Sequence, residues 1–259
     1  EAGPLKEEIQ REVGFSCKVI LTASHDTASA VMAVPSLEED TLYISSGTWS
    51  LMGCESERGN STRESREAGF TNEGGYQNRY RYLKNIMGLW MIQSVRREMA
   101  PQQSFDEICR RASKEKILSL VDCNDERFLS PQSMTAAVQE FCRETGQQEP
   151  VTISELACVI YNSLARCYGE TKEQMESLLN RKFPRIYIIG GGSNAEYLNE
   201  LTARYAGCQV SAGPAEATAL GNLLCQMLKE KCFQNLSEAR RCVIDSFEVK
   251  IYVQDSVCG

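Results

Sequence analysis

The pattern of hydrophobic and polar positions divides the chain into three parts. In the first part, short runs of β-branched and aromatic residues predict strands over residues 18–22, 41–45, 49–53 and 80–83. Small apolar residues from 26 to 34 are typical of a helix, which Pro35 ends. Residues 56–67 are polar and charged without a period, so we expect a surface loop there.

The middle of the chain has the period of amphipathic helices. We predict helices over residues 85–99, 105–112, 133–145 and 153–180, the last of them capped by Ser154. The segment from about 85 to 180 is therefore expected to be mostly helical.

The last part alternates between strand and helix patterns. A buried strand at 185–189 precedes three glycines and a helix at 194–206, and a strand at 208–211 precedes a helix at 215–228. Strands that alternate with helices favour parallel pairing, so the fold class is predicted to be α/β.

Composition excludes several classes of protein. The chain has 259 residues and a net charge of −7, which argues against a general nucleic-acid binder. Its longest apolar run, residues 86–92, is shorter than the roughly 18–20 residues of a membrane helix. No signal-peptide pattern opens the sequence, so we expect no membrane partner and a cytoplasmic location.

The sequence offers few residues that could form a metal-binding site within this chain. His25 is the only histidine, and the twelve cysteines form no Cys-x-x-Cys pair, so we predict no metal-binding residues. Cysteines in apolar helical stretches, such as Cys158 and Cys167, are interpreted as reduced, buried thiols that act as small hydrophobic side chains.

The segment His25-Asp26-Thr27 stands between a predicted strand and a predicted helix. Open α/β sheets bind ligands beyond the carboxyl ends of their strands, and an aspartate there can act as a general base toward a hydroxyl. The alternative is that Asp26 only caps the helix. A Ser-His-Asp triad through His25 is disfavoured, because the adjacent Asp26 is not expected to fold back onto the ring.

The segment Ser45-Ser46-Gly47-Thr48 predicts a tight turn between two strands. Backbone N–H groups and hydroxyls in such a turn suit an anion, especially a phosphate. The alternative is an ordinary hairpin turn without a ligand.

Gly190-Gly191-Gly192 lies between a strand and a helix, where glycines let a ligand approach the backbone. The spacing also fits the dinucleotide pattern G-x-G-x-x-A, but no acidic residue ends the next strand as that fingerprint requires, and a P-loop is absent. A possible base, a phosphate turn and a glycine loop in one α/β chain fit phosphoryl transfer.

Longer strings in the sequence carry a resemblance to a known family. In order, they are SHDTASA at 24–30, ISSGTWSLMG at 44–53, TNEGG at 71–75, RYRYLKNIMGLW at 79–90 and GGG at 190–192. The chain resembles the FGGY carbohydrate kinases over essentially its whole length. That family has the actin/hexokinase-like ATPase fold, with two ribonuclease-H-like domains and a catalytic cleft between them.

The resemblance covers the C-terminal domain of such an enzyme. It implies one α/β domain over residues 1–259, with a mixed sheet and a helical insertion at about 85–180. The N-terminal domain, with the first phosphate loop, the main magnesium-linked acid and much of the sugar pocket, is expected to be a missing partner of this chain. The start at Glu1 rather than at Met fits a cut between the two domains.

The resemblance also implies roles for individual residues. Asp26 is expected to be the base that deprotonates the C1 hydroxyl of a ketose, and ATP and Mg²⁺ are the expected cofactors. The residues expected to bind the sugar are His25, Asp26, Thr27 and Asn85. Those expected to bind ATP are Gly47, Thr48, Gln93, Gly190, Gly191 and Gly192, with Asn85 and Gln93 on one face of a helix.

Alternatives remain at two levels. The expected sugar is rhamnulose, with fuculose, xylulose or another ketose as alternatives, because much of the sugar pocket would lie in the missing domain. From a different class, the chain could be a binding module for a sugar or a nucleotide without catalytic activity. The isolated chain is expected to have little or no kinase activity.

Overall fold

The computed structural model describes residues 1–23, 25–38 and 41–254. Its main sheet has the strand order β5-β6-β4-β3-β7-β8-β9 among the described residues. Their bounds are β3 (Leu42–Ser46), β4 (Trp49–Ser56), β5 (Phe70–Gly74), β6 (Tyr80–Met87), β7 (Arg185–Ile189), β8 (Gln209–Ala212) and β9 (Lys250–Tyr252). Strands β3, β7 and β8 pair in parallel and the other neighbours pair antiparallel, so the predicted α/β class with a mixed sheet is confirmed.

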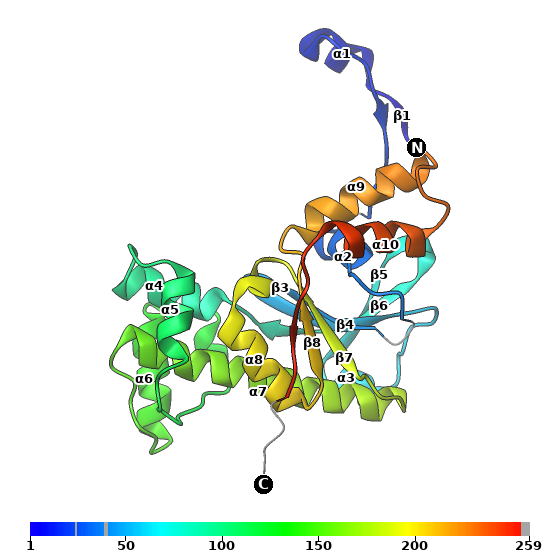
Figure 1. The fold of residues 1–259 in the computed structure, drawn as a ribbon. Helices are drawn as coiled ribbons and strands as arrows, with labels where there is room; N and C mark the ends of the chain where they lie inside the picture. The colour runs from blue at the N-terminus through cyan, green and yellow to red at the C-terminus, as the bar shows by residue number, and fades with distance from the viewer. Residues whose placement is uncertain (24, 39–40, 255–259) are drawn as a thin grey trace.

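Helices cover both faces of this sheet (Figure 1). Helices α2 (Asp26–Met32), α9 (Ala217–Lys229) and α10 (Leu236–Ser246) lie over one face, and α7 (Ile153–Leu179) and α8 (Glu196–Ala206) lie against the other. The remaining helices are α1 (Glu7–Val13), α3 (Arg63–Glu67), α4 (Trp90–Met99), α5 (Phe105–Ala112) and α6 (Met134–Glu144). Helices α4, α5 and α6 form a group beside the sheet, with α4 and α5 packed on α7.

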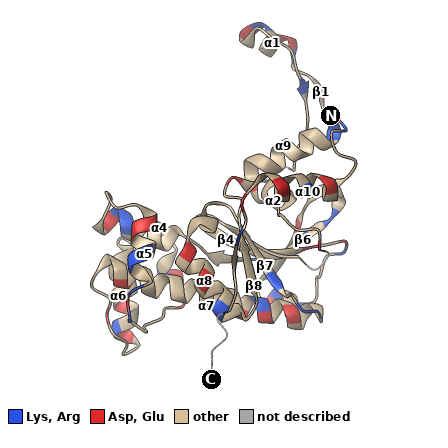
Figure 2. Cartoon of the chain, viewed as in Figure 1, with Lys and Arg blue, Asp and Glu red and all other residues tan. Residues whose placement is uncertain are grey.

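The alternation of side chains explains why the central strands are buried on both faces. On β3, Leu42 and Ile44 join the core beneath α7 and α8, whereas Tyr43 joins the core beneath α2 and α9. On β7, Ile188 and Ile189 divide between the same two cores. Strands buried on both faces show continuous apolar runs, as in 185–189. Helix α9 carries no charge before its last residue and is tan in Figure 2, whereas both signs are mixed over α5 and α6.

Four of the predicted elements are wrong in part. Residues 85–87 belong to strand β6, and the helix begins only at Trp90. The expected loop at 56–67 contains helix α3. Helix α7 is capped by Thr152, in a capping box with Glu155, and not by Ser154. The expected strand at 18–22 is limited to β2 (Lys18–Val19), which pairs with β1 (Gly3–Pro4) outside the main sheet.

The parallel strands end at one edge of the sheet, and three turns meet there. The β3–β4 turn contains Gly47 and Thr48, the glycine loop (190–195) follows β7, and a third turn follows β8. Hydrogen bonds tie the last two together: Gly213 N–H donates to Ile188 O at 2.8 Å, and Gly190 N–H donates to Pro214 O at 3.1 Å. This edge is where open α/β sheets bind their ligands.

Candidate active site

A cavity of about 510 Å³, here called the first cavity, opens where α2 begins and the β3–β4 hairpin turns. Six of the residues proposed from sequence line it, together with three that were given no role. The lining residues are His25, Asp26, Thr27, Gly47, Thr48, Trp49, Leu51, Glu73 and Asn85. Segments 25–27, 47–51, 73 and 85 are distant in the chain, so the fold brings the proposed base, turn and amide together.

Asp26 is the first residue of α2 and has an exposed carboxylate, with 74% of its side chain accessible. Its Oδ1 atom accepts a hydrogen bond from the Thr27 N–H at 2.7 Å and lies 3.1 Å from His25 Nδ1. The expectation that Asp26 does not fold back onto the histidine ring is therefore wrong. The residue at the helix cap is His25, so Asp26 is not the N-cap residue.

Asp26 does not follow a strand of the main sheet, contrary to the sequence interpretation. Its position is set instead by the packing of α2 on α9. At Gly221 of α9, an added Cβ would collide with the backbone carbonyl of Ser29, so only glycine allows this close approach. The Thr218 hydroxyl donates to the Asp26 backbone carbonyl at 3.4 Å and links α9 to the start of α2.

The β3–β4 turn is held from behind by the start of α4. The Leu89 N–H donates to Gly47 O at 3.0 Å, and the Trp90 N–H donates to Thr48 O at 3.1 Å. Gly88 makes this possible, because a Cβ there would lie 2.5 Å from the Trp49 carbonyl carbon. Since α4 uses both carbonyls, the turn is left to present donors, the N–H and hydroxyl of Thr48, which is the chemistry that a phosphate needs.

The three glycines of the glycine loop have different surroundings. Gly190 has φ +86°, and a Cβ on it would lie 2.8 Å from Ser46 O. A Cβ on Gly192 would collide with the Ser46 hydroxyl. Both glycines therefore let the loop pack directly on the end of β3. A Cβ on Gly191 would meet no atom within 4 Å, so this glycine is the one that faces open space.

A second cavity of about 280 Å³ lies between the glycine loop and helices α4, α5 and α7. Most of its side chains are apolar, which suits a flat, largely apolar base. The lining residues are Leu89, Ile92, Gln93, Phe105, Asp106, Cys109, Tyr161, Gly191, Asn194 and Ala195. Burial raises the pKa of the Tyr161 hydroxyl and of the Cys109 thiol, so both stay neutral.

Asn85 and Gln93 line different cavities. Asn85 is on β6, opposite Leu51 of β4, and lines the first cavity. Gln93 is on α4 and lines the second. The expectation that one helical face carries both residues is wrong, because the chain changes from strand to helix between them.

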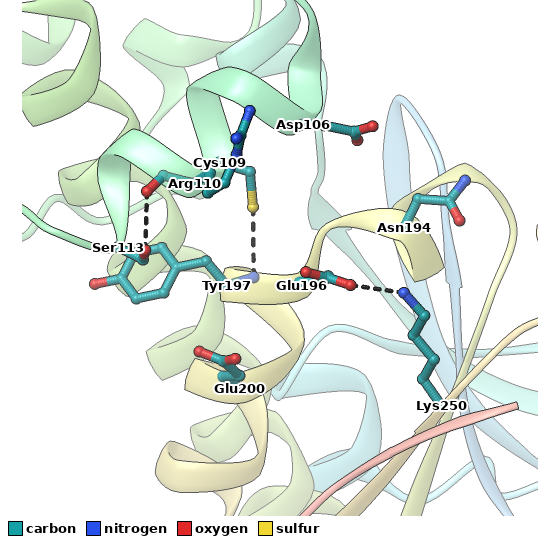
Figure 3. Close-up of a pocket in the computed structure, with 9 residues that line it drawn as sticks. All are labelled: Asp106, Cys109, Arg110, Ser113, Asn194, Glu196, Tyr197, Glu200 and Lys250. Atoms are coloured by element: carbon teal, nitrogen blue, oxygen red, sulfur yellow. Dashed lines mark hydrogen bonds and ion pairs between the residues drawn. The ribbon is translucent and has the colours of Figure 1, made fainter.

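A third cavity of about 510 Å³ adjoins the second and shares three residues with it, Asp106, Cys109 and Asn194. Figure 3 shows it between α5 and α8. The Tyr197 N–H donates to Cys109 Sγ at 3.4 Å, and Lys250 pairs with Glu196 at 2.6 Å. This charged space widens the second cavity toward β9.

Sequence reasoning gave no role to Glu73, which faces the first cavity from β5. Its Oε2 atom accepts a hydrogen bond at 2.9 Å from Arg81, whose side chain is only 2% exposed. Glu73 belongs to the TNEGG string at 71–75. The available signal was Arg81, a charged residue within the predicted strand at 80–83, which needs an acidic partner if it is buried. Trp49 and Leu51 were also missed, although both are in the ISSGTWSLMG string.

Within residues 1–23, 25–38 and 41–254, no group of three or more His, Cys, Asp or Glu residues is arranged to hold a metal ion. Among the helices of the same residues, none has the length and hydrophobicity that would let it cross a bilayer.

Comparison with curated proteins gives relatives over nearly the whole chain. It is 44% identical over 257 residues to a rhamnulokinase from Oceanobacillus iheyensis, an alignment that covers 99% of this chain and 54% of the relative. It is 45% identical over 251 residues to a rhamnulokinase from Halalkalibacterium halodurans, with 97% and 54% covered. The chain thus spans about half the length of these relatives.

Solved structures give the same fold at low sequence identity. A xylulose kinase from Rhodospirillum rubrum superposes with a TM-score of 0.69 at 11% identity, over 98% of this chain and 51% of that one. A glycerol kinase from Plasmodium falciparum, solved with ADP, gives 0.65 at 12% identity, over 96% and 49%. The profile of the C-terminal domain of the FGGY family of carbohydrate kinases matches residues 42–230. The chain therefore belongs to the FGGY family of carbohydrate kinases and contains its C-terminal domain.

Proposed function

We propose that this chain is the C-terminal half of a rhamnulokinase, which transfers a phosphoryl group from ATP to the C1 hydroxyl of L-rhamnulose. The observation that carries the proposal is the first cavity, where the exposed carboxylate of Asp26 shares one space with the Thr48 turn and Asn85. Identity of 44% to a rhamnulokinase supports this choice among sugars, because the other kinases of similar fold are only distantly related in sequence.

In this proposal Asp26 is the general base. Phosphoryl transfer depends on positioning and charge stabilisation, and the base orients the attacking hydroxyl and accepts its proton. The Thr27 N–H and His25 Nδ1, both within 3.1 Å of Asp26 Oδ1, hold that oxygen in place. The second carboxylate oxygen then faces the sugar hydroxyl, with His25, Thr27 and Asn85 binding the rest of the ketose.

The nucleotide would extend from the first cavity to the second. The Gly47-Thr48 turn binds its phosphates with N–H and hydroxyl donors, while the apolar second cavity takes the adenine beside Gly191 and Gln93. Gly190 and Gly192 contribute indirectly, by seating the loop on Ser46. In line with the family resemblance, we assign the main acidic residue that is linked to Mg²⁺ to the other half of the enzyme.

The other half of the enzyme is also needed to close the site. The carboxylate of Asp26 is open to solvent here, and water in the site would compete with the sugar for the phosphoryl group. We expect closure of the two halves to exclude that water, and the isolated chain to show little or no kinase activity.

The test is an assay of ADP release by the full-length enzyme with a panel of ketoses. We expect the largest kcat/KM with L-rhamnulose, and lower values with fuculose and xylulose. A higher value with either of the latter would contradict the sugar assignment but not the kinase activity. Absence of ADP release with every ketose, together with retained nucleotide binding, would favour a binding module instead.

A further inference from the structure

Two cysteines meet behind the active site, between α7 and the segment that precedes η2 (Glu126–Phe128). The Cys123 thiol donates to the backbone carbonyl of Ser163 at 3.7 Å, one helical turn before Cys167. The two thiols are close enough that each shifts the pKa of the other. Together with the contact of Asn124, the residue after Cys123, with Cys167 Sγ, this places the two cysteines in one cluster.

Polar neighbours surround the sulfur of Cys167. The Asn124 amide donates to Cys167 Sγ at 3.3 Å, and the Thr171 hydroxyl is a further polar neighbour. The neighbouring Cys123 thiol, with Asn124, Thr171 and the nearby charge of Lys84, lowers the pKa of the Cys167 thiol despite its burial. Donors and a cation around a sulfur are the features that make a cysteine reactive.

At three other cysteines, burial outweighs the polar and charged neighbours. Burial raises the pKa of Cys208 to about 11 and also raises the pKa of Cys225. Cys158, which is buried, likewise has a raised pKa. Cys158 is buried in the core, as the sequence interpretation expects, and Cys167 packs against the same core but is only partly buried.

The pair is also held firmly from both sides. Asn124, next to Cys123, accepts a hydrogen bond from the Met87 N–H at 3.2 Å and so joins its segment to the end of β6. Tyr168, next to Cys167, hydrogen-bonds the Ser50 hydroxyl at 2.6 Å and joins α7 to β4. Prior positioning of this kind favours reaction within the pair over reaction with other thiols.

We propose that Cys123 and Cys167 form a modification site for hydroperoxides, at which Cys167 is the attacking thiolate and Cys123 the resolving thiol. The Cys167 sulfur attacks hydrogen peroxide, so that an S–O bond forms, the O–O bond breaks and hydroxide leaves. The Cys123 sulfur then displaces the oxygen of the sulfenic acid as water, and an S–S bond forms. In total, two thiols lose two electrons and two protons, and one peroxide is reduced to two molecules of water.

To test this proposal, the full-length protein is treated with substoichiometric hydrogen peroxide, and the remaining thiols are blocked with an alkylating reagent. The peptides are then mapped by mass spectrometry. We expect a cross-linked peptide that joins Cys123 and Cys167, with both thiols lost several times faster than the Cys208 thiol. Loss of Cys208 at an equal rate, or oxidation of Cys167 without the cross-link, would overturn the proposal.

Variants separate the two roles. In Cys123→Ser, Cys167 should stop at the sulfenic acid, which a dimedone probe traps, and in Cys167→Ser the Cys123 thiol should resist peroxide. Cys208→Ser is the matched control and should leave the cross-link unchanged. Because Cys123 is buried, Cys123→Ala is the second variant, and the same dimedone adduct is expected there. Dimedone labelling of Cys123 in Cys167→Ser would reverse the assignment.

Discussion

The first and second cavities lie at the same edge of one sheet but are built in different ways. The first is lined mostly by polar residues, which come from the start of α2, the β3–β4 turn and strands β4, β5 and β6. The second is largely apolar and consists of side chains from α4, α5 and α7, packed around Gly191. The first arrangement suits bond-making at a charged group, and the second suits binding of an apolar base. Variants should therefore separate catalysis from nucleotide affinity.

The largest effect is expected for Asp26→Asn in the full-length enzyme. The amide cannot accept a proton, so kcat should fall by about a hundredfold to ten-thousandfold. Ketose affinity should stay within a few-fold, because the amide keeps the shape and the polar contacts of the carboxylate. The measurements are ADP release for turnover and calorimetry for sugar binding.

A control for this variant is Glu216→Gln, an exposed acid at the start of α9 that does not line the first cavity. It should leave turnover unchanged. Near-normal turnover in Asp26→Asn would remove Asp26 from the role of base, and loss of both kcat and sugar binding would point to a structural role.

The glycine loop beside the second cavity can be tested with two neighbouring glycines. Gly192→Ala places a Cβ against the Ser46 hydroxyl, so the free energy of unfolding should fall by about 1–3 kcal/mol. Gly191→Ala meets no atom within 4 Å and should leave stability unchanged while it narrows the second cavity and raises the KM for ATP. Denaturant unfolding and ATP kinetics measure the two effects. Equal destabilisation by both variants would contradict this division of the glycine loop.

The next prediction concerns the anchoring of the first cavity by Glu73. In Glu73→Gln, the nearly inaccessible Arg81 side chain loses its ionic partner, and stability should fall by about 1–2 kcal/mol, since Glu73 is partly exposed. The matched control is Glu67→Gln, because its partner Arg63 is well exposed and the pair should contribute less than about 1 kcal/mol. Urea unfolding of both variants measures the two losses of stability. Equal losses would show that the burial of Arg81 does not make its ion pair with Glu73 more important than the exposed pair.

The two cavities also differ in how far the sequence predicts them. Asp26, Gly47 and Thr48 stand at boundaries between elements, where local composition reveals both the turn and its chemistry. The second cavity is lined by Phe105 and Tyr161, among others, and in the sequence pattern these two residues look like ordinary core residues of helices. Their meeting depends on how α5 packs on α7, which no local pattern encodes.

Errors at the first cavity have a similar physical origin. Ile86, Leu89 and Trp90 recur at helical spacing, so the end of β6 resembled the start of a helix. Pairing with β4 overrides that pattern, because β6 completes eight residues of antiparallel ladder from Tyr80 to Met87. The sheet thus places Asn85 in the first cavity, on a strand rather than on the helix that was predicted.

The smallest effect is expected at Gln93, the polar side chain that α4 contributes to the second cavity. Gln93→Ala removes a neutral hydrogen-bonding group, which is worth about 0.5–1.5 kcal/mol, so the KM for ATP should rise by about two- to tenfold. The KM for the ketose should not change, because Gln93 does not line the first cavity. Gln174→Ala, at an exposed position on α7, is the control and should alter neither value. A change in the KM for the ketose alone would contradict the assignment of the ketose to the first cavity and of the adenine to the second. The effect of Gln93 would then reach the first cavity through the β3–β4 turn, which the start of α4 holds in place.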